Sequence, residues 1–265
     1  MSDSAENLAH GRMRVSLSGR AYTVAAARPE SAAFWTAAAN GRWEDETFRF
    51  LDAVTSEPGS VLVDVGAWIG PVALYASPKV ARVIALEPDP VAHGELAQNV
   101  AANAPNVEIW NAAVDNEPGE LKLFVGEGLG NSETSSIGQG EAITVKTVTF
   151  EALSEAAGDG PIVLKGDIEG HEYRVLESLI AFARNRRAAV HLSLQPRVYW
   201  NDARNAKGVF GSRQATFEDT WRFVQRLGEI GEVVMSSTQQ PASRTAIARK
   251  VLWKKRPKNF SVEVR

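Results

Sequence analysis

The residues best placed to do chemistry lie in two glycine-containing segments. The first is Asp64-Val-Gly-Ala-Trp-Ile-Gly70, which begins inside an apolar run and leads into a helical pattern. Glycines at such a turn let a ligand approach the backbone and let a helix begin close to a strand. Glu87 ends the next apolar run, 21 residues after Gly66, where an acidic side chain can bind the hydroxyls of a ribose. Together they predict a nucleoside-containing cofactor over the ends of two neighbouring strands.

The spacing of the glycines separates the candidate cofactors. A dinucleotide site favours G-x-G-x-x-G with a helix N-terminus open to pyrophosphate. Here Gly66 and Gly70 are separated by three residues, and Trp68 stands where the second glycine of that motif would be. Asp64 would repel a pyrophosphate, but it suits a cationic sulfonium that also carries an α-amino group. The pattern favours S-adenosylmethionine over NAD.

The second segment, Lys165-Gly-Asp-Ile-Glu-Gly-His171, supplies candidate catalytic groups. Alternation at the end of a strand predicts one shared face for Lys165, Asp167 and Glu169. A carboxylate there could remove the proton of a hydroxyl during methyl transfer; Asp167 is the first candidate and Glu169 the second, while His171 could also reach the cleft. The two carboxylates could alternatively bind Mg²⁺. A plainer alternative is that Glu169 only caps a helix and Asp167 only contacts the cofactor.

Alternating strands and helices must position these groups. Apolar runs predict strands at 61–65, 82–86, 107–110, 161–167 and 188–194, with helices at 69–77, 90–103 and 169–184 between them. This order predicts an α/β fold with a parallel sheet covered on both faces. Strands at 232–235 and 246–253 are expected to pair as an antiparallel hairpin at the sheet edge, after a helix at 216–227. Segments 126–140 and 201–214 lack periodicity and are expected to be lids or binding loops.

The N-terminal segment predicts a small extension. Residues 14–24 alternate apolar and polar side chains around Ser18-Gly19, as in a β-hairpin, and short helices are expected at 31–39 and 45–54. We therefore expect an extension at 1–55 that covers the site, a cofactor-binding domain at 56–256 and a tail at 257–265.

Composition excludes several classes of protein. The 265 residues include no cysteine, which rules out disulfides, zinc-cysteine sites and thiol nucleophiles. Lys and Arg number 29 against 32 Asp and Glu, a net charge of −3, which argues against a nucleic-acid binder held by overall charge. No apolar run reaches the length of about 20 residues that a membrane span needs, and the polar start is unlike a secretory signal. We expect a cytoplasmic protein.

The chain resembles the FkbM family of class I S-adenosylmethionine-dependent methyltransferases. The resemblance rests on the two segments above and on Trp43-Glu-Asp-Glu-Thr47, Ala85-Leu-Glu-Pro-Asp-Pro90, Asn111-Ala-Ala-Val114, Thr134-Ser-Ser-Ile137 and Thr147-Val-Thr-Phe-Glu151. It implies a Rossmann-like, seven-stranded, mostly parallel sheet with a reversed last strand. It also implies O-methylation of a hydroxyl on a saccharide, a glycan or a polyketide-type secondary metabolite, with a small molecule or glycan as acceptor.

Residues, spacing and resemblance together define the expected site. The expected cofactor-binding residues are Glu44, Asp64, Gly66, Ala67, Trp68, Gly70, Glu87, Pro88, Asn111, Ala112 and Asp167. The chain departs from the family at Trp68, at Gly166 and at Gln195, which stands where related sequences carry His. These departures keep open a catalytically impaired cofactor-binding or scaffold protein of the same fold. An NAD-linked oxidoreductase is disfavoured by the glycine spacing, and a homodimer is compatible with the sequence.

Overall fold

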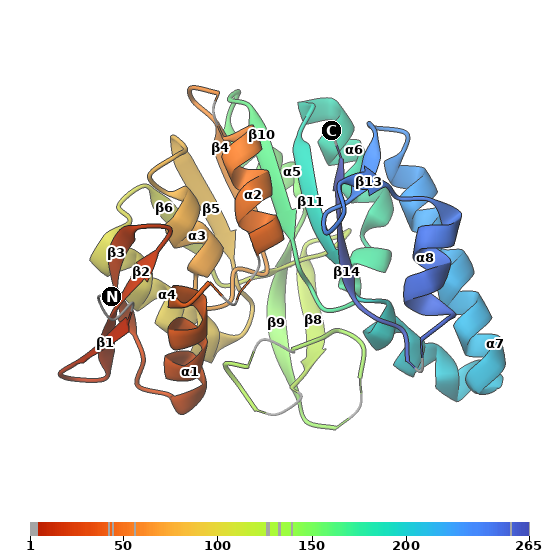
Figure 1. The fold of residues 1–265 in the computed structure, drawn as a ribbon, viewed down its shortest axis with the longest axis horizontal. Helices are drawn as coiled ribbons and strands as arrows, with labels where there is room; N and C mark the ends of the chain where they lie inside the picture. The colour runs from red at the N-terminus through yellow and green to blue at the C-terminus, as the bar shows by residue number, and fades with distance from the viewer. Residues whose placement is uncertain are drawn as a thin grey trace.

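The computed structural model describes residues 5–41, 43, 45–55, 57–125, 128–131, 134–138, 140–254 and 256–264, without the side chains of 201–211. Its centre is a mixed sheet in the order β13-β12-β14-β11-β10-β4-β5-β6 (Figure 1). The strands are β4 (Val61–Val65), β5 (Arg82–Leu86), β6 (Val107–Trp110), β10 (Ile162–Gly166), β11 (Ala189–Leu194), β12 (Val233–Met235), β13 (Gln240–Pro241) and β14 (Phe260–Val264).

The strand directions confirm the expected architecture. Strands β6, β5, β4, β10 and β11 pair in parallel, and β14 is antiparallel to both β11 and β12. The mostly parallel sheet with a reversed last strand is therefore present, with the two-residue β13 added at one edge. The chain order reverses between β4 and β10, and α/β proteins bind ligands at such a point, beyond the carboxyl ends of the strands.

Helices cover both faces of the sheet. On one face, α2 (Asp45–Val54), α3 (Pro71–Ala76) and α4 (Pro90–Asn103) pack on Leu62 and Val83. On the other, α5 (Phe150–Ala157), α6 (Leu176–Arg186), α7 (Pro196–Leu227) and α8 (Arg244–Val251) pack on Val63 and Ile84. Burial of these apolar faces provides the main favourable term for folding. No helix in the described part of the chain is long and apolar enough to cross a membrane.

Two small sheets flank the central one. The predicted hairpin is present as β2 (Arg12–Leu17) and β3 (Arg20–Ala25), and β1 (Ala5–Leu8) adds a third strand that the sequence did not predict. The extension continues into α1 (Pro29–Ala39) and is fixed to α4, because Asn99 accepts a hydrogen bond of 2.6 Å from the backbone N–H of Ala25. The second small sheet comprises β7 (Ala113–Val114), β9 (Ala142–Val148) and β8 (Gly119–Phe124).

Three sequence predictions about the C-terminal half were wrong. Residues 246–253 fall mostly in helix α8, where Ser243 caps the first turn and Ile247 and Val251, four residues apart, bury one face. The partner of β12 is instead β14, inside the predicted tail at 257–265, so the central sheet extends past the boundary expected at 256. Segment 201–214 lies within α7 and not in a loop. This helix begins at Pro196, and proline is favoured in a first helical turn because its φ is already helical.

The helix expected from 169 begins later. Gly170 has φ +94°, and a short 3₁₀ turn, η1 (His171–Tyr173), precedes α6 at Leu176. A left-handed residue cannot continue a right-handed helix, so Glu169 and Gly170 form a turn. Within the second chemical segment, Lys165 and Gly166 therefore end β10, residues 167–170 form a loop, and His171 begins η1.

Candidate functional site

A cavity of about 350 Å³ lies at the carboxyl ends of β4, β5 and β10. Nine of the residues predicted for the site line it: Gly66, Ala67, Trp68, Glu87, Pro88, Ala112, Asp167, Glu169 and His171. Asp64, Gly70 and Asn111 lie behind its wall, and Glu44 lies outside the described residues. Phe34 and Trp43 from the N-terminal extension also line the cavity, so segments far apart in the sequence build one site.

The first glycine segment forms a tight turn directly under the cavity. Gly66 has φ +80°, and the backbone N–H groups of Gly66 and Ala67 both donate to the carbonyl of Leu86. A Cβ on Gly66 would lie 1.9 Å from the carbonyl oxygen of Asp167, so only glycine lets β4 and the β10 loop approach this closely. Gly70, with φ +93°, begins α3 next to Leu96.

Glu87 is held rigidly at the cavity wall. Its Oε2 accepts a hydrogen bond of 2.8 Å from the backbone of Trp68, and its Oε1 accepts one of 2.8 Å from the backbone of Asp89. Burial raises the pKa of Glu87 to about 7, although these hydrogen bonds oppose the rise. Asn111 donates to the carbonyls of Glu87 and Pro88, so it supports the cavity wall from behind.

Asp64 does not reach the cavity, because Lys165 lies over it. The Asp64 side chain is fully buried and its Oδ1 lies 3.4 Å from Nζ of Lys165, which also donates to the carbonyl of Gly66 at 3.0 Å. Burial raises the pKa of Asp64, and Lys165 opposes that rise. Adjacent pairing of β4 and β10 places Lys165 beside Asp64.

Asp167 and Glu169 converge on one side-chain amide. Nε2 of Gln195 donates to Oδ1 of Asp167 at 3.0 Å and to Oε1 of Glu169 at 3.2 Å. Glu169 has φ +50°, a left-handed conformation that is rare outside glycine and turns its side chain toward this group. Gln195 stands at the N-cap position of α7 and is buried, and its side chain bonds the two carboxylates in place of the helix backbone. The site thus contains two carboxylates oriented by a neutral donor.

Glu172 is a site residue that sequence reasoning missed. Its carboxyl group is buried and accepts hydrogen bonds from the backbone of Gln195 at 2.7 Å and of Gly170 at 2.8 Å. It therefore joins the loop after β10 to the start of α7 and fixes Gln195 relative to Asp167. Only its position one residue after the motif ending at His171 could have drawn attention to it.

We expect Glu172→Gln to make folding less dependent on pH. Burial raises the pKa of Glu172 from 4.5 to about 8, so between these values the unfolded chain releases this proton first. The free energy of unfolding then falls as the pH rises, by at most about 1.4 kcal/mol per pH unit for one group. Urea unfolding at several pH values should show a shallower decline for the variant. Exposed Glu155→Gln serves as control, and identical profiles for Glu172→Gln and the wild type would contradict the assignment.

A family model described as "Methyltransferase FkbM domain" matches residues 64–230, which include both glycine segments and the Gln195 loop. The chain belongs to the FkbM methyltransferase family. The match begins at Asp64, at the end of β4, and ends after α7, so it covers the cavity apart from the N-terminal extension.

The individual proteins that this FkbM-family chain resembles share 31% or less of its residues over the matched regions. The hexuronic acid methyltransferase AglP of Haloferax volcanii is 31% identical over 140 residues, which span 52% of this chain and 57% of that protein. A solved methyltransferase FkbM from Methylobacillus flagellatus KT is 12% identical with a TM-score of 0.44, covering 80% of this chain and 44% of that one. A TehB-like methyltransferase from Corynebacterium glutamicum is 12% identical with a TM-score of 0.46, covering 89% and 96%.

His171 joins the loop around residue 136 to the second small sheet. Its Nδ1 lies 2.7 Å from Oγ of Ser136, and its Nε2 lies 3.5 Å from Oδ1 of Asp115. Burial lowers the pKa of His171, and the nearby Asp115 opposes the shift. Because both ring nitrogens face protein groups, His171 is better placed to hold the cavity wall than to take a proton from a ligand.

The N-terminal extension contributes aromatic side chains to the cavity. Phe34 packs edge-on against Trp68 at 4.5 Å between ring centroids and against Trp43 at 5.1 Å. Such edge-to-face pairs add to the stabilisation that burial gives. The backbone of Trp68 has φ +49°, a left-handed conformation within the turn between β4 and α3. Its ring contacts Phe34 of the N-terminal extension.

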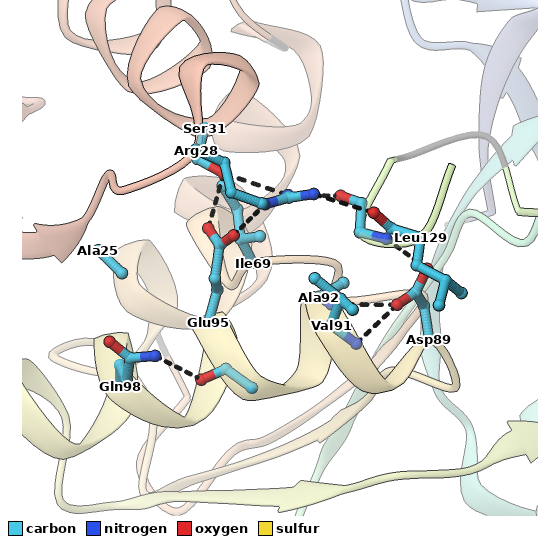
Figure 2. A network of polar contacts seen from close by, with 12 residues as sticks. Ala25, Arg28, Ser31, Ile69, Asp89, Val91, Ala92, Glu95, Gln98 and Leu129 are labelled. Carbon is cyan, nitrogen blue, oxygen red and sulfur yellow. Dashed lines mark hydrogen bonds and ion pairs between the residues drawn. The ribbon is translucent and has the colours of Figure 1, made fainter. Parts of the chain in front are cut away.

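The segment at Leu129 is hydrogen-bonded to Arg28 of the N-terminal extension (Figure 2). Gly130 donates 2.6 Å to Oδ2 of Asp89 and accepts from Nη2 of Arg28 at 2.6 Å and from Nε1 of Trp68 at 2.9 Å. Arg28 also pairs with Glu95 on α4. Asn131 and Thr134 line the cavity. The described parts of 126–140 therefore border the site, and their role as a lid stays a prediction.

The alternative in which Asp167 and Glu169 bind Mg²⁺ finds no support in the described side chains. Within the described ranges, no group of three or more His, Asp or Glu residues is arranged to hold a metal ion. The two candidate ligands, Asp167 and Glu169, face the amide N–H₂ of Gln195, a donor that competes with a cation for the same oxygens.

Proposed function

We propose that this protein is an S-adenosylmethionine-dependent O-methyltransferase that acts on a hydroxyl of a saccharide. The observation that carries the proposal is the single cavity that brings Glu87 from the end of β5 together with Asp167 and Glu169 from the end of β10. The family supports methyl transfer, and the hexuronic acid methyltransferase named above supports a saccharide acceptor. The match to that protein spans little more than half of its length, so acceptor and activity are proposals for this chain.

The cavity fits the donor by the chemistry of its walls. The Glu87 carboxylate can accept hydrogen bonds from two neighbouring ribose hydroxyls. Pro88 and Ala112 offer apolar surface to a flat base, and the turn at Gly66 has no side chain that would fill the space. When bound, S-adenosylmethionine supplies a methyl group on a cationic sulfur, and the acidic wall favours that charge.

Asp167, Glu169 and the aromatic residues of the cavity suit the activation of a hydroxyl, which is a weak nucleophile. Methyl transfer requires the hydroxyl oxygen, the methyl carbon and the sulfur to lie in line, with water excluded. Asp167 borders the cavity and its position is fixed by Gln195, so we assign it the removal of the hydroxyl proton. Glu169, held by the same amide, orients the acceptor. Phe34, Trp43 and Trp68 provide the apolar cover that keeps water out.

Titration calorimetry tests the donor site. We expect wild-type protein to bind S-adenosylhomocysteine, with affinity rising between pH 6 and 8 as Glu87 ionises around its pKa of about 7. Glu87→Gln should bind about 10- to 100-fold more weakly at pH 8, because a hydrogen bond to a charged group contributes about 1.5–3 kcal/mol. It should also lose the pH dependence.

Glu120→Gln, an exposed change on β8, is the matched control and should bind like the wild type. An unchanged dissociation constant for Glu87→Gln would remove Glu87 from the site. Binding of NADH in place of S-adenosylhomocysteine would contradict the proposed cofactor. Binding of S-adenosylhomocysteine without methylation of any saccharide tested would favour the catalytically impaired protein.

A further inference from the structure

Residues 244–258 form a strongly basic segment in an acidic chain. They contain seven Lys and Arg residues and no Asp or Glu: Arg244, Arg249, Lys250, Lys254, Lys255, Arg256 and Lys258. The chain as a whole has a formal charge of −3, so this positive charge is local. A concentration of one sign of charge raises the local concentration of ligands of opposite sign.

The segment also exposes an aromatic ring. Trp253 is 65% exposed, the highest value among the exposed large hydrophobic side chains in the described part of the chain. The guanidinium of Arg249 lies 5.8 Å from the centre of its ring. Around it, Lys254, Arg256 and Lys258 are exposed, and within the described residues none of these three side chains makes an ion pair with a carboxylate. The charges therefore remain available to a ligand.

The fold brings the end of this segment to the edge of the sheet at which the cavity opens. Strand β14 is antiparallel to β11, so its first residue, Phe260, pairs with Leu194 at the edge where the parallel strands end. Asn259 accepts a hydrogen bond from the backbone of Arg197, two residues after Gln195. Arg213 of α7 donates to the carbonyl of Lys254. In Figure 1 the chain descends through α8 and re-enters the sheet as β14 from the edge at which α7 begins.

We propose that the surface formed by Arg249, Trp253, Lys254, Arg256 and Lys258 binds an acidic saccharide, so that the acceptor carries carboxylate groups next to the sugar that is methylated. This inference rests on the proposed function and names the class of its acceptor. Lys and Arg side chains pair with the carboxylates, Arg in bidentate fashion, and the free face of the Trp253 ring packs on the apolar face of a sugar.

Other anionic partners fit the surface less well. Single-stranded nucleic acid is bound by several aromatic side chains that stack successive bases, and the other exposed large hydrophobics in the described residues, Val91 and Leu129, lie elsewhere in the chain. A membrane-bound helix buries a whole apolar face, whereas the apolar face of α8, Ile247 and Val251, packs inside the protein. One ring among cations, on the chain that leads into β14, suits a charged oligosaccharide.

Titration of the full chain, saturated with S-adenosylhomocysteine, tests the proposal with two probes, trigalacturonic acid and neutral maltotriose. We expect binding of the acidic probe only, weakening as salt is raised. The triple variant Lys254→Gln/Arg256→Gln/Lys258→Gln should bind it about tenfold more weakly, since exposed ion pairs contribute about 0.2–1 kcal/mol each. Trp253→Ala should also weaken binding.

The control is Arg12→Gln/Arg14→Gln/Arg20→Gln, three exposed basic residues on the N-terminal sheet, which should leave the affinity unchanged. Equal affinity of both triple variants for trigalacturonic acid would overturn the proposal, as would tighter binding to phosphatidylglycerol vesicles or to polyuridylic acid. Because each sample is first titrated with S-adenosylhomocysteine, failure of the donor site is seen separately from failure of the saccharide surface.

Discussion

Asp167→Asn is expected to lower the turnover number by about 10²–10⁴-fold, the usual contribution of a positioned general base. Asparagine has nearly the same shape, so the cavity keeps its volume, but an amide cannot take the proton of the acceptor hydroxyl. It also presents either an oxygen or an N–H₂ group to Nε2 of Gln195, which lies 3.0 Å from Oδ1 in the wild type. We therefore expect turnover to fall far more than donor affinity.

The measurement is methylation of the acceptor by mass spectrometry, beside calorimetry with S-adenosylhomocysteine. Asp52→Asn is a matched control: Asp52 lies on α2 and contacts Tyr75 and Lys79, away from the cavity. Turnover of Asp167→Asn within a factor of about two of the wild type would exclude Asp167 as the base. The assignment would then pass to Glu169, tested by Glu169→Gln.

Gly66→Ala is expected to destabilise the protein by about 3 kcal/mol or more, the range reached when backbone strain adds to steric overlap. Its φ of +80° is unfavourable for alanine, and the new Cβ would lie 1.9 Å from the carbonyl oxygen of Asp167. That oxygen belongs to the backbone of the loop after β10, so relief of the overlap must move β4 and the loop apart. Donor binding should fall together with stability.

Gly59→Ala separates the effect of backbone strain from the effect of steric overlap. Gly59 has φ +83°, close to that of Gly66, but a Cβ there meets nothing within 4 Å. We expect this control to lose only the conformational contribution, about 1–2 kcal/mol, and to bind S-adenosylhomocysteine normally. Urea unfolding measures both variants. Equal losses of stability would show that the close approach of Asp167 to Gly66 has no energetic consequence.

Much of the fold could be predicted because its signals are local. The runs at 61–65, 82–86 and 107–110 are short, mostly apolar and followed by Gly66, Glu87 and Asn111, and each becomes a strand with those bounds. Glycines in the first turn and the acidic residue after the second strand lie within one βαβ unit. Their relative positions follow from strand pairing alone, so Glu87 and Gly66 were expected to border one cavity, and they do.

The C-terminal predictions failed because the decisive contacts are not local. Residues 246–253 and 260–264 are both short apolar runs, and the periodicity of so few residues does not separate a strand from a helix. Residues 244–251 are helical because Ser243 caps the first turn and Ile247 and Val251 bury one face of the helix. The space between β11 and β12 was then filled by Phe260–Val264.

The sequence by itself determined the residue types of the site: a glycine turn, an acidic residue after the second strand, and two carboxylates after the fourth strand of the parallel series. Only the tertiary structure decided their partners. In the folded protein Lys165 pairs with Asp64, and Gln195 donates to both Asp167 and Glu169. Glu172 is buried and accepts a hydrogen bond from the backbone of Gln195. The reason is physical: hydrogen bonds and ion pairs act over a few ångströms, and it is the pairing of distant strands that brings such groups within that distance.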